Sequence, residues 1–244
     1  MLLLSVLQFS CYSGWEKYEL DEITTIKNYN WFYDTIDLKF NNSTGIEIII
    51  ENNLAFKDLN KNGKLDNYEN WTLPADERAE DLISQMTIEE KAGSIFIDIT
   101  KVTFQGIKAS GFVSSLPDTH HTINNLKMNH FNIIDSYEPA KMIEWYNNIQ
   151  KTAEESRLGI PITIASDPRH GAPDPNSPIS VSSSSFSVWP STLGLGAIGD
   201  EDLVEEFGNI VRQEYKSIGI NLALGPMADI ATEPRWTRVD GTFG

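Results

Sequence analysis

The most restrictive feature of this sequence is a regular alternation of short apolar stretches with amphipathic helical segments. From residue 94 onward the pattern predicts the strand 94–100, the helix 140–158, the strand 160–165, the helix 201–218 and the strand 221–224. The predicted strands are apolar on both faces and are connected by helices, which is typical of parallel strands. We therefore expect an α/β fold in this part of the chain.

Two α/β architectures fit this order of elements, an open doubly wound sheet and a (β/α)8 barrel. No G-x-G-x-x-G or Walker motif follows a predicted strand, which weighs against a nucleotide-binding sheet. The predicted strands are too few to close a barrel of eight parallel strands. If the fold is a barrel, the sequence covers only part of it.

The charge of the chain limits its partners. Acidic residues outnumber basic residues by 35 to 19, which gives a formal net charge of −16. Phosphate recognition needs clustered Lys and Arg, so we expect no nucleic acid as a partner. No apolar run is long enough for a membrane span. The apolar start Met1–Leu7 has no Lys or Arg before it, unlike a signal peptide, so the localisation stays unknown at this point.

Residues 57–72 contain a stretch that matches the EF-hand calcium loop at every ligand position. The expected metal ligands are Asp58, Asn60, Asn62, Lys64 through its backbone carbonyl, Asp66 and Glu69. The segment 48–56 before the loop reads as extended and not as an entering helix, and an Asx-rich turn without metal is the alternative interpretation. We expect the loop to hold a structural Ca²⁺ that takes no part in catalysis.

The polar residues that follow the predicted strands are candidates for ligand binding, since ligands of α/β folds bind at the carboxyl ends of strands. Asp167 follows the strand 160–165, and Arg235 and Arg238 come after the strand 221–224. A carboxylate and a guanidinium that meet in one pocket would hold adjacent hydroxyl groups of a sugar. The alternative is a structural network of ion pairs among these groups and Asp229.

Four motifs, in order along the chain, resemble the N-terminal part of glycoside hydrolase family 3, the family of many β-glucosidases. They are the stretch 78–93, the D-x-x-H-G motif at 167–171, W-P-S-T-L-G-L-G at 189–196 and the block 225–244. The resemblance covers residues 58–244. It implies that residues 73–244 form the N-terminal part of a (β/α)8 barrel, preceded by an irregular extension over residues 1–56.

The resemblance also implies a function for the whole protein, a retaining hydrolysis of terminal β-D-glucosyl residues without a cofactor for catalysis. By position, Asp167 and Arg238 would hold the terminal sugar, His170 would shape the turn beneath it, and Arg235 belongs to the same motif. The nucleophile and the acid/base are expected beyond Gly244, so we expect the chain to be a fragment with no catalytic residue and no activity by itself.

Several alternatives stay open within this interpretation. The substrate is expected to be a β-linked glucoside or an oligosaccharide, but a β-xylosidase or a related exo-glycosidase fits as well. A non-catalytic, calcium-clipped carbohydrate-binding module is the alternative from another functional class. The parent protein is expected to be secreted or periplasmic.

Overall fold

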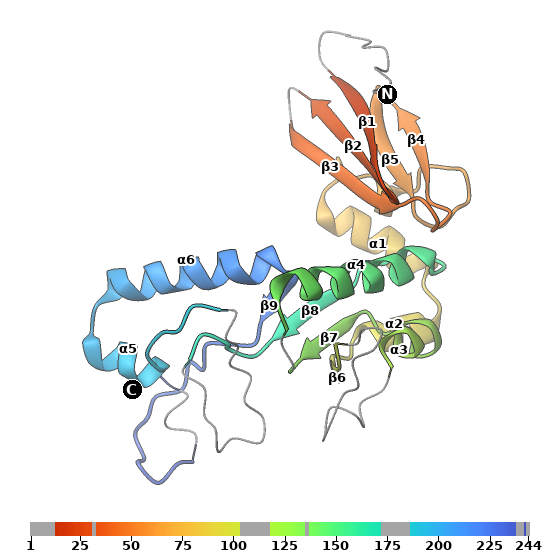
Figure 1. Cartoon of the computed structure of the whole chain (residues 1–244). Helices are drawn as coiled ribbons and strands as arrows, with labels where there is room; N and C mark the ends of the chain where they lie inside the picture. The colour runs from red at the N-terminus through yellow and green to blue at the C-terminus, as the bar shows by residue number, and fades with distance from the viewer. Residues whose placement is uncertain are drawn as a thin grey trace. The chain divides into compact units, whose positions relative to one another are not determined.

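The computed structural model describes residues 13–30, 33–102, 118–134, 137–171 and 186–237, together with residue 242. The chain divides into two compact units (Figure 1). The first unit comprises residues 1–93 and 150–161, and the second comprises residues 94–149 and 162–244. Among the described residues, the first unit contains two sheets and the second contains one.

The first unit is built on antiparallel strands. One sheet has the order β1-β2-β3, and β4 and β5 form a hairpin. The strands are β1 (Ser13–Leu20), β2 (Ile23–Asn30), β3 (Tyr33–Asn41), β4 (Glu47–Glu51) and β5 (Leu54–Asp58). Thr24, Ile26 and Asn28 of β2 are buried, and they alternate with less buried residues, as expected when one face of a sheet meets the core.

Asn28 joins the two sheets of this unit. Its Nδ2 donates to the backbone oxygen of Ala55 at 3.2 Å, and its Oδ1 accepts from the backbone N–H of Ala55 at 2.7 Å. Ile26, Phe40, Ile46 and Ala55 form the buried apolar cluster beside it. A buried amide satisfied at both ends is compatible with an apolar core and sets the register between the sheets.

The expectation of an irregular segment over residues 1–56 is wrong for the described residues from 13 onward, because β1 to β5 occupy most of them. The extended segment 48–56 is confirmed, since β4 and β5 cover most of it. β1 was not recognisable because nearly all its side chains are at least partly exposed, and its sequence lacks the apolar alternation that marks a strand. Residues 1–12 lie outside the described residues.

Three short helical elements follow β5, namely η1 (Asn67–Glu69), α1 (Ala75–Gln85) and α2 (Ile88–Ser94). A capping box begins α2: the backbone N–H of Glu90 donates to Thr87 Oγ1 at 3.2 Å, and that of Thr87 donates to Glu90 Oε2 at 2.9 Å. The end of α4 (Pro139–Glu155) also belongs to this unit, where Glu154 Oε1 accepts from Lys57 Nζ at 2.9 Å.

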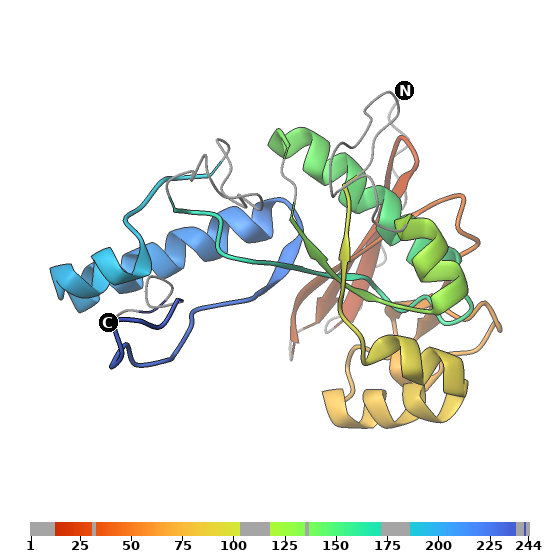
Figure 2. The ribbon, with the colours of Figure 1, turned by 90° about the horizontal axis from the view of Figure 1, so that it is seen from below.

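The second unit holds a sheet of parallel strands in chain order, β6-β7-β8-β9 (Figures 1 and 2). Its strands are β6 (Asp98–Thr100), β7 (His130–Ile133), β8 (Thr163–Ser166) and β9 (Ile220–Ala223). Its helices are α3 (Thr119–Leu126), most of α4, α5 (Thr192–Ile198) and α6 (Glu201–Ser217). The expected α/β arrangement is confirmed, but the sheet of the described residues does not close into a barrel.

Most elements of this unit agree with the sequence. The helices expected at 140–158 and 201–218 are α4 and α6, and the strands expected at 160–165 and 221–224 are β8 and β9. The sequence did not predict β7, α3 or α5. β7 has the sequence HFNI, in which His and Asn interrupt the apolar run by which a buried strand is recognised.

The strand expected at 94–100 is only partly correct. β6 is limited to Asp98–Thr100, and the apolar side chains before it are not buried. Ile95 is 80% exposed, Phe96 61% and Ile97 46%. The apolar run therefore does not indicate burial here, because all three side chains keep a large exposed area.

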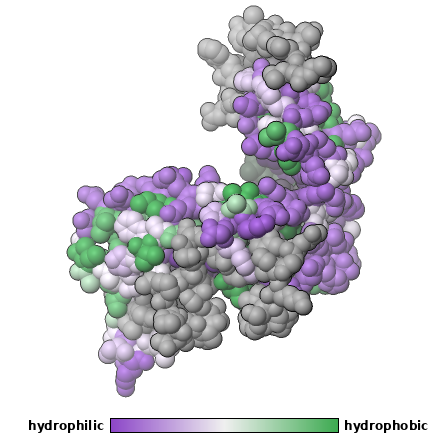
Figure 3. All heavy atoms as spheres, viewed as in Figure 1, coloured by the Kyte–Doolittle hydropathy of each residue, from purple (hydrophilic) through white to green (hydrophobic). Residues whose placement is uncertain are grey.

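The polar residues of α6 face solvent, as its amphipathic sequence predicts. Figure 3 shows hydrophilic residues along the outer edge of this helix and hydrophobic residues next to them.

The strands of the first unit carry mainly hydrophilic residues on the face in view. Among the described helices, none is both long and apolar enough to cross a membrane.

Candidate functional site

Asp167 lies directly after β8, at the carboxyl end of the parallel sheet. Its carboxylate is half-buried, and Oδ2 accepts a hydrogen bond from Asn132 Nδ2 at 2.9 Å. Its backbone oxygen accepts from the hydroxyl of Tyr215 at 2.8 Å and from Ser166 Oγ at 2.9 Å. Groups from β7, β8 and α6 therefore hold both the backbone and the side chain of this residue.

Arg169 lies beneath the same turn and is 1% exposed. Its guanidinium donates to the backbone oxygen of Ile133 at 2.6 Å and, through Nε, to Ser166 Oγ. A buried guanidinium requires such acceptors, because an unpaired buried charge is costly. Arg169 thus ties the end of β7 to the end of β8, and it supports the turn from within the fold.

His170 is also buried, and Nε2 lies 2.7 Å from Glu214 Oε2 of α6. Burial lowers the pKa of the imidazole, although the neighbouring carboxylate opposes this effect. A carboxylate only accepts hydrogen bonds, so the neutral ring carries its proton on Nε2. The ring packs against Phe186 and Tyr215, with centroid distances of 5.0 and 5.2 Å. The expected role of His170, shaping the turn beneath a sugar, stays a prediction.

Glu214 links the turn at His170 to the segment that begins at Phe186. Its carboxylate accepts from the backbone N–H of Ser187 at 3.1 Å and from Ser187 Oγ at 3.2 Å. The backbone N–H of Trp189 donates to the backbone oxygen of His170 at 2.7 Å. The W-P-S-T motif that begins at Trp189 is therefore anchored to the D-x-x-H-G motif.

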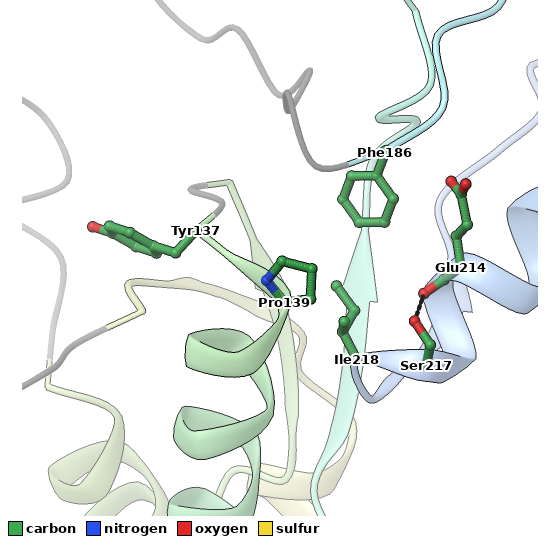
Figure 4. A pocket seen from close by; sticks show the side chains of 6 residues that line it. All are labelled: Tyr137, Pro139, Phe186, Glu214, Ser217 and Ile218. Carbon is green, nitrogen blue, oxygen red and sulfur yellow. Dashed lines mark hydrogen bonds between the residues drawn. The ribbon is translucent and has the colours of Figure 1, made fainter.

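A small pocket lies beside Glu214 (Figure 4). It is lined by Tyr137, Pro139, Phe186, Glu214, Ser217 and Ile218. Figure 4 shows Pro139, Phe186 and Ile218 around one common space, while Ser217 Oγ donates to the backbone oxygen of Glu214. The pocket is mainly apolar and does not include Asp167, so it is not the place where the sequence puts a sugar.

Of the two arginines of the candidate site, only Arg235 lies among the described residues. Arg235 is exposed and forms a two-pronged ion pair with Glu233, with Nε–Oε1 and Nη2–Oε2 distances of 2.8 Å. This bond lowers the pKa of Glu233 to about 2. Arg235 makes no bond to Asp167 among the described residues. Arg238 lies outside the described residues, so its predicted contact with the sugar stays a prediction.

The EF-hand-like loop follows β5 and is held together by its own polar groups. Asp58 is 1% exposed, and its oxygens accept from the backbone N–H groups of Asn62 at 3.0 Å and Gly63 at 2.8 Å. Asn60 and Asn62 donate from Nδ2 to Asp66 Oδ2 at 2.6 and 2.7 Å.

Glu69, the last expected ligand of this loop, is turned toward the backbone. Its Oε1 accepts from the N–H of Leu59 at 2.6 Å and of Asn60 at 3.1 Å, and burial raises the pKa of its carboxyl. In the described part of the chain, no group of three or more His, Cys, Asp or Glu residues is arranged to hold a metal ion. The calcium site therefore stays a prediction. Lys64 is exposed, and its N–H donates to Asn62 Oδ1.

Asp167, His170 and the residues that bond them form what we call the Asp167 site. The sequence did not indicate three of these bonding residues, namely Asn132, Tyr215 and Glu214. Asn132 was in a segment read as loop, and Tyr215 was assigned only to the apolar face of a helix. Glu214 stood out by neither position nor motif. A polar residue at the end of a short strand is the signal that would have found Asn132, because carboxyl ends of parallel strands lie side by side.

Comparison with known proteins supports the resemblance to glycoside hydrolase family 3. Residues 98–244 match the family model described as glycosyl hydrolase family 3 N-terminal domain. The chain is 49% identical over 201 residues, or 82% of its length, to a periplasmic beta-glucosidase/beta-xylosidase of Dickeya chrysanthemi. It is 43% identical over 72% of its length to beta-glucosidase C of Emericella nidulans. It is 25% identical over 67% of its length to a periplasmic beta-glucosidase of Salmonella typhimurium.

The aligned parts are small shares of these relatives. They amount to 30% of the Dickeya protein, 28% of the Emericella protein and 18% of the Salmonella protein. The chain thus spans less than a third of each of these proteins. The family match, in contrast, extends over more than half of this chain, and the chain belongs to glycosyl hydrolase family 3.

Proposed function

We propose that the whole protein is an exo-acting, retaining glycosidase that removes terminal β-glucosyl or β-xylosyl residues. In this proposal the present chain supplies part of the binding site for the terminal sugar. The observation that carries it is the placement of Asp167, which stands at the carboxyl end of a parallel strand with one carboxylate oxygen fixed by Asn132. The chain belongs to a family of glycosidases, and this supports a sugar as the ligand of Asp167.

The proposed contribution of Asp167 is to accept hydrogen bonds from sugar hydroxyl groups. An ionised carboxylate has room for several donors, and Asn132 occupies only one position on Oδ2. Arg238 would donate to the sugar from the other side. Because hydroxyl groups are neutral, this mode of binding does not require the clustered positive charge that a chain with net charge −16 lacks.

Bond cleavage in this mechanism needs two further carboxyl groups, a nucleophile and an acid/base. We place both outside this chain, so that the chain alone binds sugar without hydrolysing it. The whole protein would form a glycosyl-enzyme intermediate and resolve it with water. A continuous assay of the chain with an aryl β-glucoside checks this, and turnover above the buffer rate would overturn the assignment.

Two sugars are kept as candidates because a relative bears both activities in its name, beta-glucosidase and beta-xylosidase. The two glycones differ by a hydroxymethyl group, which hydrophobic contacts distinguish only weakly. We further propose that the parent protein acts in the periplasm or outside the cell, since the Dickeya and Salmonella relatives are named as periplasmic.

The test of the sugar site is a titration of the isotope-labelled chain with methyl β-D-glucopyranoside and methyl β-D-xylopyranoside, followed by NMR. Asp167→Ala is expected to weaken binding of the preferred glycoside by about 100-fold, the effect of losing charge-assisted hydrogen bonds. Asp202→Asn, an exposed carboxylate in the first turn of α6, serves as the control and should leave binding unchanged. Equal affinities of the Asp167 variant and the unaltered chain would refute the assignment.

A further inference from the structure

Asn132 is the residue that holds the carboxylate of Asp167 from the neighbouring strand. It lies in β7, opposite Ala165 of β8, and its Nδ2 donates to Asp167 Oδ2 at 2.9 Å. Tyr215 and Ser166 also contact Asp167, but they bind its backbone oxygen. Among the described residues, only Asn132 forms a hydrogen bond to the carboxylate itself.

The other end of the Asn132 side chain has no partner. Oδ1 is buried, and no hydrogen-bond donor reaches it in the part of the chain that the structure describes. A buried carbonyl without a donor costs stability, whereas an apolar side chain of similar shape would avoid that cost. The unpaired Oδ1 thus offsets stabilisation that Nδ2 gains from Asp167, which points to a role other than stability.

We propose that Asn132 is a positioning residue for sugar binding. By occupying Asp167 Oδ2 it holds the carboxylate in one rotamer and leaves Oδ1 for the hydroxyl groups of the sugar. A side chain that is already oriented loses less conformational freedom when the ligand binds, and the affinity rises accordingly. This inference rests on the proposed sugar-binding function and adds a residue to that site which the family motifs do not contain.

The placement of Asn132 supports this role over a general structural one. Arg169, the buried group behind the same turn, bonds the backbone oxygen of the next residue in β7, Ile133. The turn and the strand ends are thus connected without Asn132. Removing its amide would leave this connection intact and would free only the carboxylate of Asp167.

The first test compares the unaltered chain with Asn132→Leu and with the control Asn129→Leu. Asn129 is also buried, but it lies before β7, next to His130, at the opposite end of the strand. We expect Asn132→Leu to weaken binding of methyl β-D-glucopyranoside or methyl β-D-xylopyranoside by about tenfold, as for one charge-assisted hydrogen bond. Its melting temperature should change little, because the lost bond to Asp167 and the removed unpaired carbonyl offset each other. Asn129→Leu should bind like the unaltered chain.

Asn132→Asp gives a readout that a merely structural role would not move. At neutral pH it places two carboxylates within hydrogen-bond distance, which repel each other, and binding should be lost. At a pH of about 4.5, one shared proton restores a donor between them, and binding should return. The unaltered chain is measured over the same pH range to separate this rescue from general effects of acid.

The outcomes separate the two proposals. If the unaltered chain binds a glycoside and Asn132→Leu binds it within about twofold, the role of Asn132 is refuted while the sugar site stands. A lower melting temperature of Asn132→Leu, with no acid rescue of Asn132→Asp, would also refute it, because the loss would be structural. If the unaltered chain binds neither glycoside, the proposed sugar site is refuted and this inference with it.

Discussion

Asp58 and Asp167 are both inward-facing carboxylates in sequence motifs that predict a ligand, but the fold treats them differently. Asp58 is 1% exposed, and each of its oxygens accepts a backbone N–H of its own loop. Asp167 is half-buried and has one oxygen fixed by Asn132. No donor to its other oxygen is found among the described residues.

The difference separates a carboxylate that holds a loop from one that keeps an oxygen without a donor in the described part of the chain, as the proposed sugar site requires. Both hydrogen-bonded oxygens of Asp58 stabilise the turn through Asn62 and Gly63, so this residue contributes to folding even without a metal. Asp167 makes fewer bonds with its side chain, and the bonds that support its turn come from Tyr215 and Arg169. A motif therefore indicates which residues matter, whereas the contacts around each residue indicate whether it matters for folding or for binding.

The largest expected effect follows from removing the carboxylate of Asp58. Asp58→Ala leaves the backbone N–H of Gly63 without an acceptor and that of Asn62 with only Asn60 Oδ1 at 3.1 Å, and it should lower the free energy of unfolding by about 2 kcal/mol. Urea denaturation in the presence of EDTA, monitored by circular dichroism, measures this effect without any contribution from metal. Lys64→Ala, an exposed position in the same loop, is the control and should stay within about 0.5 kcal/mol. A loss below about 1 kcal/mol for Asp58→Ala would contradict the structural role.

The second effect concerns calcium. If the loop binds Ca²⁺, its carboxylates hold a ligand, as we propose for Asp167. Binding requires the side-chain oxygens of Asn60 and Asn62 to turn toward the ion, in place of the Nδ2 groups that now face Asp66. A Ca²⁺ concentration ten times the dissociation constant should then stabilise the chain by about 1.4 kcal/mol.

Thermal unfolding with and without 10 mM Ca²⁺, a concentration on the order of ten times the dissociation constant of a weak extracellular site, measures this stabilisation. Asp66→Ala should abolish the response. Lys64→Ala should retain it, because only the backbone carbonyl of Lys64 is an expected ligand. Identical midpoints of the unaltered chain in Ca²⁺ and in EDTA would favour the alternative of an Asx-rich turn without metal.

Much of the second unit was predictable because its long helices and two of its strands have strong periodic patterns. The helix boundaries at 201–218 agree closely with α6, which begins after Asp200 as its N-cap and ends before Gly219. β7 was not predictable, since HFNI shows neither a continuous apolar run nor an alternation. The strands of the first unit were hidden in the same way, as β1 exposes residues on both faces.

The candidate site was predictable where a residue follows a predicted strand or belongs to a motif. Asp167 was found from its position after the strand 160–165 and His170 from the D-x-x-H-G motif, and the structure gives both a defined environment. Asn132 and Glu214 come from distant parts of the chain, and only the parallel pairing of β7 with β8 and the packing of α6 bring them near. Such contacts depend on tertiary structure, which local sequence patterns do not contain.

A third effect tests the interior of the Asp167 site through pH. Burial holds the pKa of His170 below its ordinary value of 6.5. Below pH 6.5 the unfolded chain therefore binds a proton that the folded chain excludes, and stability falls as the pH drops toward the folded-state pKa.

Between pH 6.5 and 5.5 this group should therefore lower the free energy of unfolding. Urea denaturation at both values measures the loss, and His170→Gln should reduce it because glutamine does not titrate. If His170→Gln has the same pH dependence as the unaltered chain, burial of the imidazole does not control stability in this range.

The smallest expected effect, at Asp167, gives the most direct comparison of the two carboxylates, because the same substitution is made at both. Asp167→Asn keeps an oxygen that accepts from Asn132, so the free energy of unfolding should change by less than about 0.5 kcal/mol. Asp58→Asn keeps only one of two acceptors and places a second donor beside a backbone N–H, so it should cost about 1.5 kcal/mol. Both values come from urea denaturation in EDTA. Equal costs at the two positions would mean that Asp167 is as structural as Asp58, and the distinction between holding a loop and awaiting a ligand would fail.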